Sequence, residues 1–206
     1  MDVSLFPTKG NLIQARNTLR LSRQGYELLD KKRNILIREM MMLIDKAEQI
    51  QSHIDITFRE AYEALQIANI TIGISTVEQM GYAVPIEDSV DIRFRSIMGV
   101  EIPMVTMVQQ EITPRYGFFR TNAALDEAYK KFDKVKKLTV DLAEIENAVY
   151  RLANNIKKTQ KRANALKNIM IPRYEKLTFV IQNALEEKER EEFTRLKMIK
   201  NSKDEK

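Results

Sequence analysis

Cysteine and tryptophan are absent from this 206-residue sequence, and histidine occurs only once. The lack of cysteine excludes disulfide bonds and thiolate metal sites, which fits a protein of a reducing compartment. Glycine and proline are scarce, with six and five residues, whereas 31% of all residues are charged. No uninterrupted apolar run approaches the roughly 18 residues of a membrane span, and the first ten residues lack a signal-peptide layout. We therefore expect a cytoplasmic protein built mainly of long helices.

Residues that could carry catalysis are also missing. The single histidine, His53, has no second histidine or cysteine with which to form a metal site, so we interpret it as a solvated residue on a helix surface. Neither Gly73 nor Gly81 is followed by the Lys-Ser/Thr pair of a phosphate-binding loop. The sequence therefore predicts a protein that is not an enzyme, with no catalytic residue, metal site or cofactor.

A long apolar stripe runs through the N-terminal third of the chain. It begins after Thr8, a plausible helix N-cap, and only Ser22, Arg33 and Thr57 interrupt it. Its members are Leu12, Ala15, Leu19, Ser22, Tyr26, Leu29, Arg33, Leu36, Met40, Leu43, Ala47, Ile50, Ile54, Thr57, Ala61, Ala64 and Ala68. Alternating steps of three and four residues form the heptad pattern of a left-handed coiled coil. We predict a coiled-coil helix within residues 1–69, in which Gly25 either permits close approach of another chain or is merely tolerated.

A second stripe of the same period occupies the C-terminal third. It comprises Leu138, Leu142, Ile145, Val149, Leu152, Ile156, Thr159, Ala163, Leu166, Met170, Arg173, Leu177, Val180 and Ala184. The pattern predicts a helix from near Asn122 to about Lys200 within a C-terminal segment of residues 122–206. Pro172 lies inside this helix and removes one backbone hydrogen bond, so we expect a kink there.

The region between the stripes, residues 70–121, has a different composition. It holds Gly73, Gly81, Pro85, Gly99, Pro103, Pro114 and Gly117. Apolar and polar residues alternate over residues 90–95 and again over residues 100–102, which indicates two short strands. We predict a short helix or loop followed by a β-hairpin that turns within residues 96–99, with Pro103 at an edge or strand end.

Charge indicates how the two long helices pair. A basic patch at Arg16, Arg20 and Arg23 can face the glutamates of residues 186–192 only if the helices are antiparallel. The charge blocks predict that residues near Arg20 lie beside Glu187, and those near Glu48 beside Lys161. The predicted fold is thus mainly α: a long antiparallel two-helix coiled coil from the N- and C-terminal segments, with a small central region containing a short β-hairpin.

Two classes of function fit such a fold. One is a static coiled-coil tether or scaffold protein, and the other is a mechanical shaft. A nucleic-acid binder should carry a basic face of one sign with aromatic stacking residues, whereas this chain alternates its charge patches and has a net charge of only +5. We therefore expect no nucleic-acid partner.

Short motifs at both ends of the chain, and two between them, resemble those of a known family. They are Pro7-Thr8-Lys9, Lys31-Lys32-Arg33, Tyr116-Gly117-Phe118, Asn122-Ala123-Ala124-Leu125-Asp126, Asn164-Ala165-Leu166 and Ile171-Pro172. Their order and spacing resemble the D subunits of the V-type/A-type rotary ATPases and ATP synthases, which form the central stalk shaft. The resemblance spans nearly the whole chain and is strongest over its last fifty residues.

The resemblance implies a non-catalytic rotor component that couples ATP synthesis or hydrolysis to proton or sodium ion transport. Its implied partners are the catalytic and regulatory subunits of the ATPase hexamer, a small central-stalk subunit and a funnel-like subunit that links to the membrane rotor ring. Its implied location is cytoplasmic, peripheral to the membrane. The helix ends would insert into the hexamer, so we expect partner contacts from Arg16, Arg20, Arg23, Lys188, Arg190, Arg195 and Lys197.

Overall fold

The computed structural model describes residues 6–84, 89–107, 116–117, 119 and 121–204. The chain divides into two compact units. Residues 1–34 and 157–206 form the first, which we call the terminal unit, and residues 35–156 form the second, which we call the central unit. Pro85, Pro114 and Phe118, which entered the sequence predictions, lie outside the described residues.

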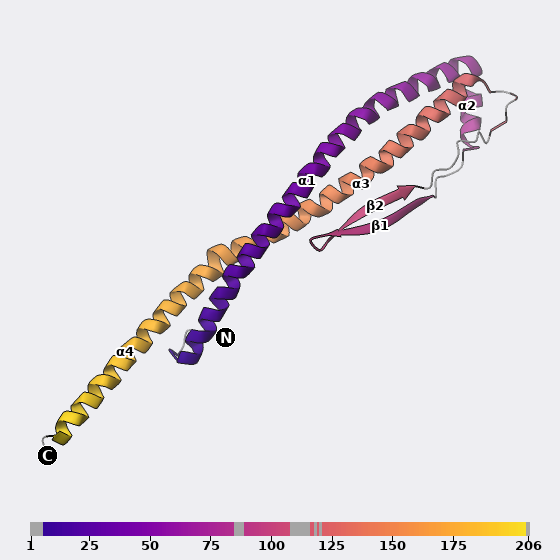
Figure 1. The fold of residues 1–206 in the computed structure, drawn as a ribbon. Coiled ribbons are helices and arrows are strands. Elements are labelled where there is room, and N and C mark those ends of the chain that lie inside the picture. Colours follow the sequence, from indigo (N-terminus) through magenta and orange to yellow (C-terminus); the bar gives the residue numbers. More distant parts are fainter. Residues whose placement is uncertain (1–5, 85–88, 108–115, 118, 120, 205–206) are drawn as a thin grey trace. The chain divides into compact units, whose positions relative to one another are not determined.

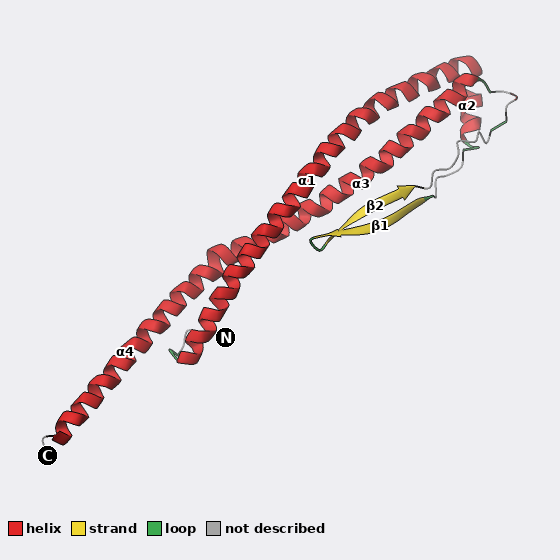
Figure 2. Cartoon of the chain, in the orientation of Figure 1, coloured by secondary structure: helices red, strands yellow, loops and turns green. Residues whose placement is uncertain are grey.

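Helices account for most of the described chain, as the apolar stripes predicted (Figures 1 and 2). The elements follow in the order α1 (Lys9–Ile72), α2 (Ile74–Gly81), β1 (Val90–Ile97), β2 (Val100–Met107), α3 (Ala123–Ala165), η2 (Leu166–Met170) and α4 (Ile171–Asp204). The predicted fold class is confirmed, because the long N-terminal helix packs against the C-terminal helix and a two-stranded antiparallel hairpin lies between them in sequence.

In the terminal unit, the beginning of α1 runs antiparallel to α4. Thr8 caps α1 as predicted: its side-chain oxygen accepts a hydrogen bond from the backbone N–H of Asn11 at 3.2 Å. The buried residues of this unit are Ala15, Ser22, Thr159, Ala163 and Ile181. Ser22 and Thr159, which interrupt the apolar stripes, are therefore small enough to lie within the helix interface rather than outside it.

Local contacts explain two unusual residues of the N-terminal helix, Arg33 and Gly25. Arg33 is only partly exposed, and its guanidinium contacts Asp30 at 2.6 Å and the side-chain oxygen of Gln160 at 2.8 Å. A methyl group added to Gly25 would lie 3.5 Å from the Leu166 side chain, which is ordinary van der Waals contact. Gly25 therefore lies at a close approach of the two helices, but the space would also accept alanine.

The helix is widened immediately before Pro172. Residues Leu166–Met170 form a π-helical turn, η2, in which the backbone N–H of Ile171 bonds to the Leu166 carbonyl five residues back. A proline ring clashes with the carbonyl four residues earlier in a regular α-helix, and a wider turn relieves that clash. The sequence predicted a kink at Pro172, and the structure has a π turn directly ahead of the proline.

The central unit contains the two largest fully buried side chains, Leu36 of α1 and Leu152 of α3. They form one cluster with Ala148 and with two residues of β2, Val100 and Ile102. Because β2 contributes side chains to the same cluster as α1 and α3, the hairpin completes this apolar core. The burial of these side chains drives the association of the hairpin with the helix pair.

Aromatic and polar contacts align α1 with α3 toward the connection between them. The rings of Tyr62 and Phe132 meet edge to face with 5.6 Å between centroids. Asn122 donates from its side chain to the Thr71 hydroxyl at 2.8 Å, and its side-chain oxygen accepts from the Leu125 N–H at the start of α3. Asn122 therefore both caps α3 and ties its first turn to α1.

A second apolar cluster lies near the same end of α3. Tyr116, Ala68 and Leu125 are buried together, and Val77 and Met80 of α2 pack against them. The Tyr116 hydroxyl donates to the Asp126 carboxylate at 2.6 Å. Burial, followed by this hydrogen bond and the Asp126 charge, raises the pKa of Tyr116. Of the two predicted alternatives for this region, a short helix or a loop, the structure has a helix, α2, and Val77 and Met80 on it cover this cluster.

The hairpin has a two-residue turn with positive φ angles. Met98 and Gly99 have φ angles of 51° and 74°, and Ile97 pairs with Val100 across the turn. Positive φ at both turn positions matches the right-handed twist of the strands. The strands are longer than the sequence pattern indicated, because Pro103 lies inside β2 opposite Phe94 rather than at the strand end.

The predicted pairing register of the long helices is wrong. Lys9 contacts Glu189, Arg16 contacts Gln182 and Arg23 contacts Glu175, so each advance of seven residues along α1 matches a retreat of seven along α4. This register places Arg20 opposite residues near 178 rather than beside Glu187. Lys161 follows Gln160, whose partner is Arg33 of the terminal unit, whereas Glu48 belongs to the central unit.

Candidate partner-contact surface

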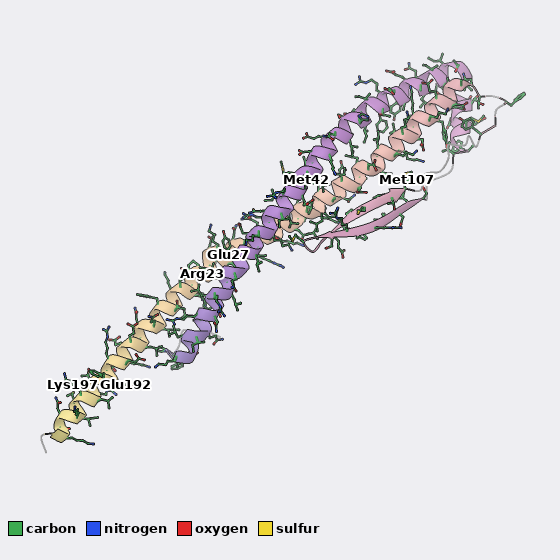
Figure 3. The ribbon with its side chains drawn as sticks, viewed as in Figure 1. Arg23, Glu27, Met42, Met107, Glu192 and Lys197 are labelled. Atoms are coloured by element: carbon green, nitrogen blue, oxygen red, sulfur yellow. The ribbon has the colours of Figure 1, made fainter. Side chains whose placement is uncertain are left out.

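The C-terminal part of α4 extends beyond its partner helix. Lys9, the first residue of α1, contacts Glu189 with 3.0 Å between nitrogen and oxygen. Residues 191–203 are all exposed, and α4 ends at Asp204. At 1.5 Å per residue, this extension adds roughly 22 Å of unpaired helix. It presents side chains in every direction around its axis, as Figure 3 shows near Glu192 and Lys197.

The basic residues of α1 that we expected at a partner contact are exposed but partly engaged within the chain. Arg16 donates to Gln182 at 2.9 Å, and Arg23 to Glu175 at 2.7 Å. Arg20 is exposed. The structure thus brings Arg16 and Arg23 to the α1–α4 interface, where their guanidinium groups align the two helices.

The basic residues expected on α4 are exposed and lie among acidic ones. Arg195 contacts Glu191 one turn earlier at 3.7 Å. Lys188, Arg190 and Lys197 are exposed as well. A shallow depression of this helix is lined by Glu186, Glu187, Glu191, Arg190 and Arg195. The surface therefore carries both signs of charge, so a partner would meet alternating cations and anions rather than cations alone.

Apolar side chains on the same extension were not among the expected contact residues. Phe193, Leu196, Met198 and Ile199 are each more than half exposed, and Phe193 retains 71% of its accessible area. The heptad pattern does not predict them, because Phe193, Leu196 and Ile199 do not continue its register beyond Ala184. Met198 does continue it, but the preceding stripe positions 187, 191 and 194 are polar. Three of them have a signal in the sequence, an apolar residue at every third position: Phe193, Leu196 and Ile199.

The described residues contain no cluster of metal-ligating side chains. Among them, no three His, Asp or Glu side chains gather as a metal site would require. His53 is exposed on α1, as interpreted from the sequence. No helix in the described part of the chain combines the length and apolar character needed to cross a membrane.

Comparison with known proteins gives a consistent result. The family model for the ATP synthase D subunit matches residues 11–201. The V-type ATP synthase D subunit of Thermotoga neapolitana is 46% identical over 198 residues, which cover 96% of this chain and 98% of that protein. The A-type ATP synthase D subunit of Methanobrevibacter smithii is 39% identical, covering 95% and 86% of the two chains. That of Pyrococcus furiosus is 34% identical, covering 94% and 92%.

Proposed function

This chain belongs to the family of ATP synthase D subunits, and from that membership we propose that it is the central rotor shaft of a V-type/A-type ATP synthase. In this role it couples ATP synthesis or hydrolysis in a catalytic hexamer to the transport of protons or sodium ions. The family match over residues 11–201 is the observation that carries the proposal. The helix pairing within each unit supports it, because transmitting torque requires long, continuous helices.

We propose that the terminal unit is the part that enters the hexamer. The start of α1 and the first half of α4 lie side by side there, and α4 continues past Lys9 as a single exposed helix. A narrow asymmetric element that meets three otherwise equivalent catalytic sites would favour a different conformation in each. Rotation of that element would then change the three sites in turn.

Contact with the hexamer would be made by Arg16, Arg20, Arg23, Lys188, Arg190, Arg195 and Lys197. Exposed ion pairs contribute little individually and are screened by salt, so no single pair would lock the rotor at one angle. The glutamates between the α4 cations, such as Glu187 and Glu191, limit the strength of any one contact further. The remaining partners would be a small central-stalk subunit and a funnel-like subunit joined to the membrane rotor ring, and the chain would then lie on the cytoplasmic side of the membrane.

The complex rebuilt from purified subunits tests this proposal. We expect a chain that ends at Glu192 to reduce ATP-driven ion transport more strongly than ATP hydrolysis, because the inserted helix is shorter. Joint neutralisation of Arg20, Lys188, Arg190 and Lys197 should weaken assembly or coupling, whereas each single change should do little. Neutralising Lys130 and Lys134, which are exposed in the central unit, is the matched control. Normal coupling with both altered chains would refute the placement of the terminal unit.

A separate experiment tests the non-catalytic role. The sequence contains no phosphate-binding loop, and the described residues form no metal cluster. We expect titration calorimetry of the pure chain with Mg-ATP to show no saturable heat. Saturable binding at micromolar concentration would contradict a purely mechanical role.

A further inference from the structure

The outer edge of β2 faces α3. In an antiparallel hairpin closed by the pair Ile97 and Val100, successive residues bond alternately toward the partner strand and away from it. Val100, Ile102 and Met104 direct their backbone groups toward β1. The backbone groups of Glu101, Pro103 and Val105 therefore point outward, along the edge that unpaired strands normally leave open.

At two of these outward positions a backbone group bonds to a side chain of α3, and the third position is a proline. The Val105 N–H donates to the Glu144 carboxylate at 2.5 Å. The Glu101 carbonyl accepts from the Arg151 guanidinium at 3.3 Å. Pro103, between them, has no N–H to satisfy and is buried. One outward N–H and one outward carbonyl are thus bonded to α3 side chains, and the proline between them removes a third donor.

The spacing of the two α3 residues matches the spacing of the two strand positions. Glu144 and Arg151 are seven residues apart, so they share one helix face and are separated by roughly 10 Å. Glu101 and Val105 are four residues apart, which is roughly 13 Å along a strand. The order is reversed, so β2 runs antiparallel to α3. Arg151 also reaches β1, because its guanidinium lies 5.2 Å from the centre of the Phe94 ring.

We propose that Glu144 and Arg151 are the positioning residues of the hairpin, which they fix to α3 by its β2 edge so that β1 is presented outward. Burial of Val100 and Ile102 supplies attraction, but apolar contact is non-directional and does not select which edge is held. The two charge-assisted hydrogen bonds are directional and select both the edge and the register. Figure 1 shows β2 as the strand nearer α3.

The exposure of β1 agrees with a hairpin held by its β2 edge. All residues of β1 are exposed except Ile97, and Ile92 and Phe94 each retain 56% of their accessible area. A two-stranded hairpin is marginally stable alone in water, so its order depends on how it is held. The inference does not depend on the proposed rotor role, because it concerns only contacts within the central unit.

The Glu144 contact can be tested by NMR-detected hydrogen exchange on the full-length chain. In E144A we expect the Val105 amide to exchange roughly tenfold faster, because it loses a bond to a charged acceptor. E144Q keeps the shape and one acceptor oxygen, so it should restore part of the protection. E146Q, at an exposed position on the same helix, is the matched control and should leave Val105 unchanged. Equal Val105 exchange in E144A and E146Q would overturn the proposal.

The Arg151 contact has an independent signature. The ring of Phe94 should shift the side-chain proton resonances of Arg151 upfield, and R151K should keep the cation while losing the forked donor geometry. We expect R151A with E144A to accelerate exchange at Ile102 and Met104 as well, because the hairpin is no longer held. If those inward amides keep their protection in the double variant, the apolar core alone positions the hairpin and the proposal is wrong.

Discussion

Different kinds of contact stabilise the inside of each unit. In the central unit, large side chains such as Leu36 and Leu152 are completely buried, and a hairpin adds Val100 and Ile102 to the same cluster. In the terminal unit, most of the buried residues are small or polar, and charged or polar pairs such as Arg23 with Glu175 join the helices. Apolar burial stabilises by a few kcal/mol per side chain, whereas exposed ion pairs contribute about 1 kcal/mol or less. Contacts in the central unit should therefore contribute most of the free energy of unfolding, whereas the polar pairs of the terminal unit mainly align its helices.

The largest expected effect comes from the core of the central unit. Leu152→Ala should lower the free energy of unfolding by about 3 kcal/mol, because it leaves a cavity among Leu36, Val100 and Ile102. Chemical denaturation followed by circular dichroism measures this loss. Leu28→Ala, at a position that is 68% exposed in the terminal unit, is the matched control and should change stability little. Equal losses of unfolding free energy in the two variants would contradict the greater contribution of the central unit to stability.

A smaller effect is expected at the second apolar cluster of the central unit. Tyr116→Phe removes the hydrogen bond to Asp126 and should cost about 1 kcal/mol at neutral pH. The pKa of Tyr116 is raised on folding, mainly by burial, so the folded state favours the neutral phenol. The stability that this supplies is complete below the unfolded pKa of about 10 and is lost as the pH rises through the folded pKa.

Denaturation of both proteins at pH 7 and above a pH of about 10 tests that dependence. The wild-type chain should lose more stability than Tyr116→Phe as the pH rises, so the difference between them narrows. Tyr150→Phe, at an exposed tyrosine of α3, is the control for general alkaline effects. A constant difference across the whole range would show that Tyr116 ionises as freely in the folded chain as in the unfolded one.

Ion pairs of the terminal unit should matter less still. Arg23 and Glu175 are each about half exposed, so Arg23→Gln should cost about 0.5 kcal/mol, and the cost should fall in high salt. A double-mutant cycle with Glu175→Gln isolates the energy of the pair. A coupling energy of several kcal/mol would mean that this contact holds the helices together rather than aligning them.

The smallest effect on stability is expected at the α4 extension. Removal of residues 193–206 should leave the free energy of unfolding nearly unchanged, because residues 191–203 are exposed. Denaturation of the shortened chain measures this directly. A loss comparable to that of Leu152→Ala would show that the extension packs against the chain in solution, and it would contradict its proposed availability to a partner.

Much of the fold could be predicted because its signals are local. Heptad spacing specified the long helices, and alternation around residues 90–95 specified the hairpin. The full strand length was missed because Pro103 is unfavourable inside a strand, and only its outward-facing position beside α3 makes it acceptable. That position follows from the hairpin register, in which Ile97 pairs with Val100, and the alternation of apolar and polar residues alone does not specify this register.

The register of the helices and the contact surface could be predicted only in part. Blocks of charge predicted that the helices are antiparallel, but the offset they indicated was wrong. Specific pairs such as Lys9 with Glu189 define the true offset. The charged contact residues stay a prediction, and the exposed apolar residues Phe193 and Leu196 were overlooked because they follow no core period.

The π-helical turn has a consequence for how this family can change over evolutionary time. The hydrogen bond from Ile171 to Leu166 spans one residue more than an α-helical bond does, so residues Leu166–Met170 accommodate a surplus residue. A deletion elsewhere in a coiled coil rotates every later side chain by about 100° and removes it from the interface. A deletion within this turn would instead restore regular geometry, so single-residue gaps among relatives should concentrate here, and a relative with such a gap should also lack the proline at position 172.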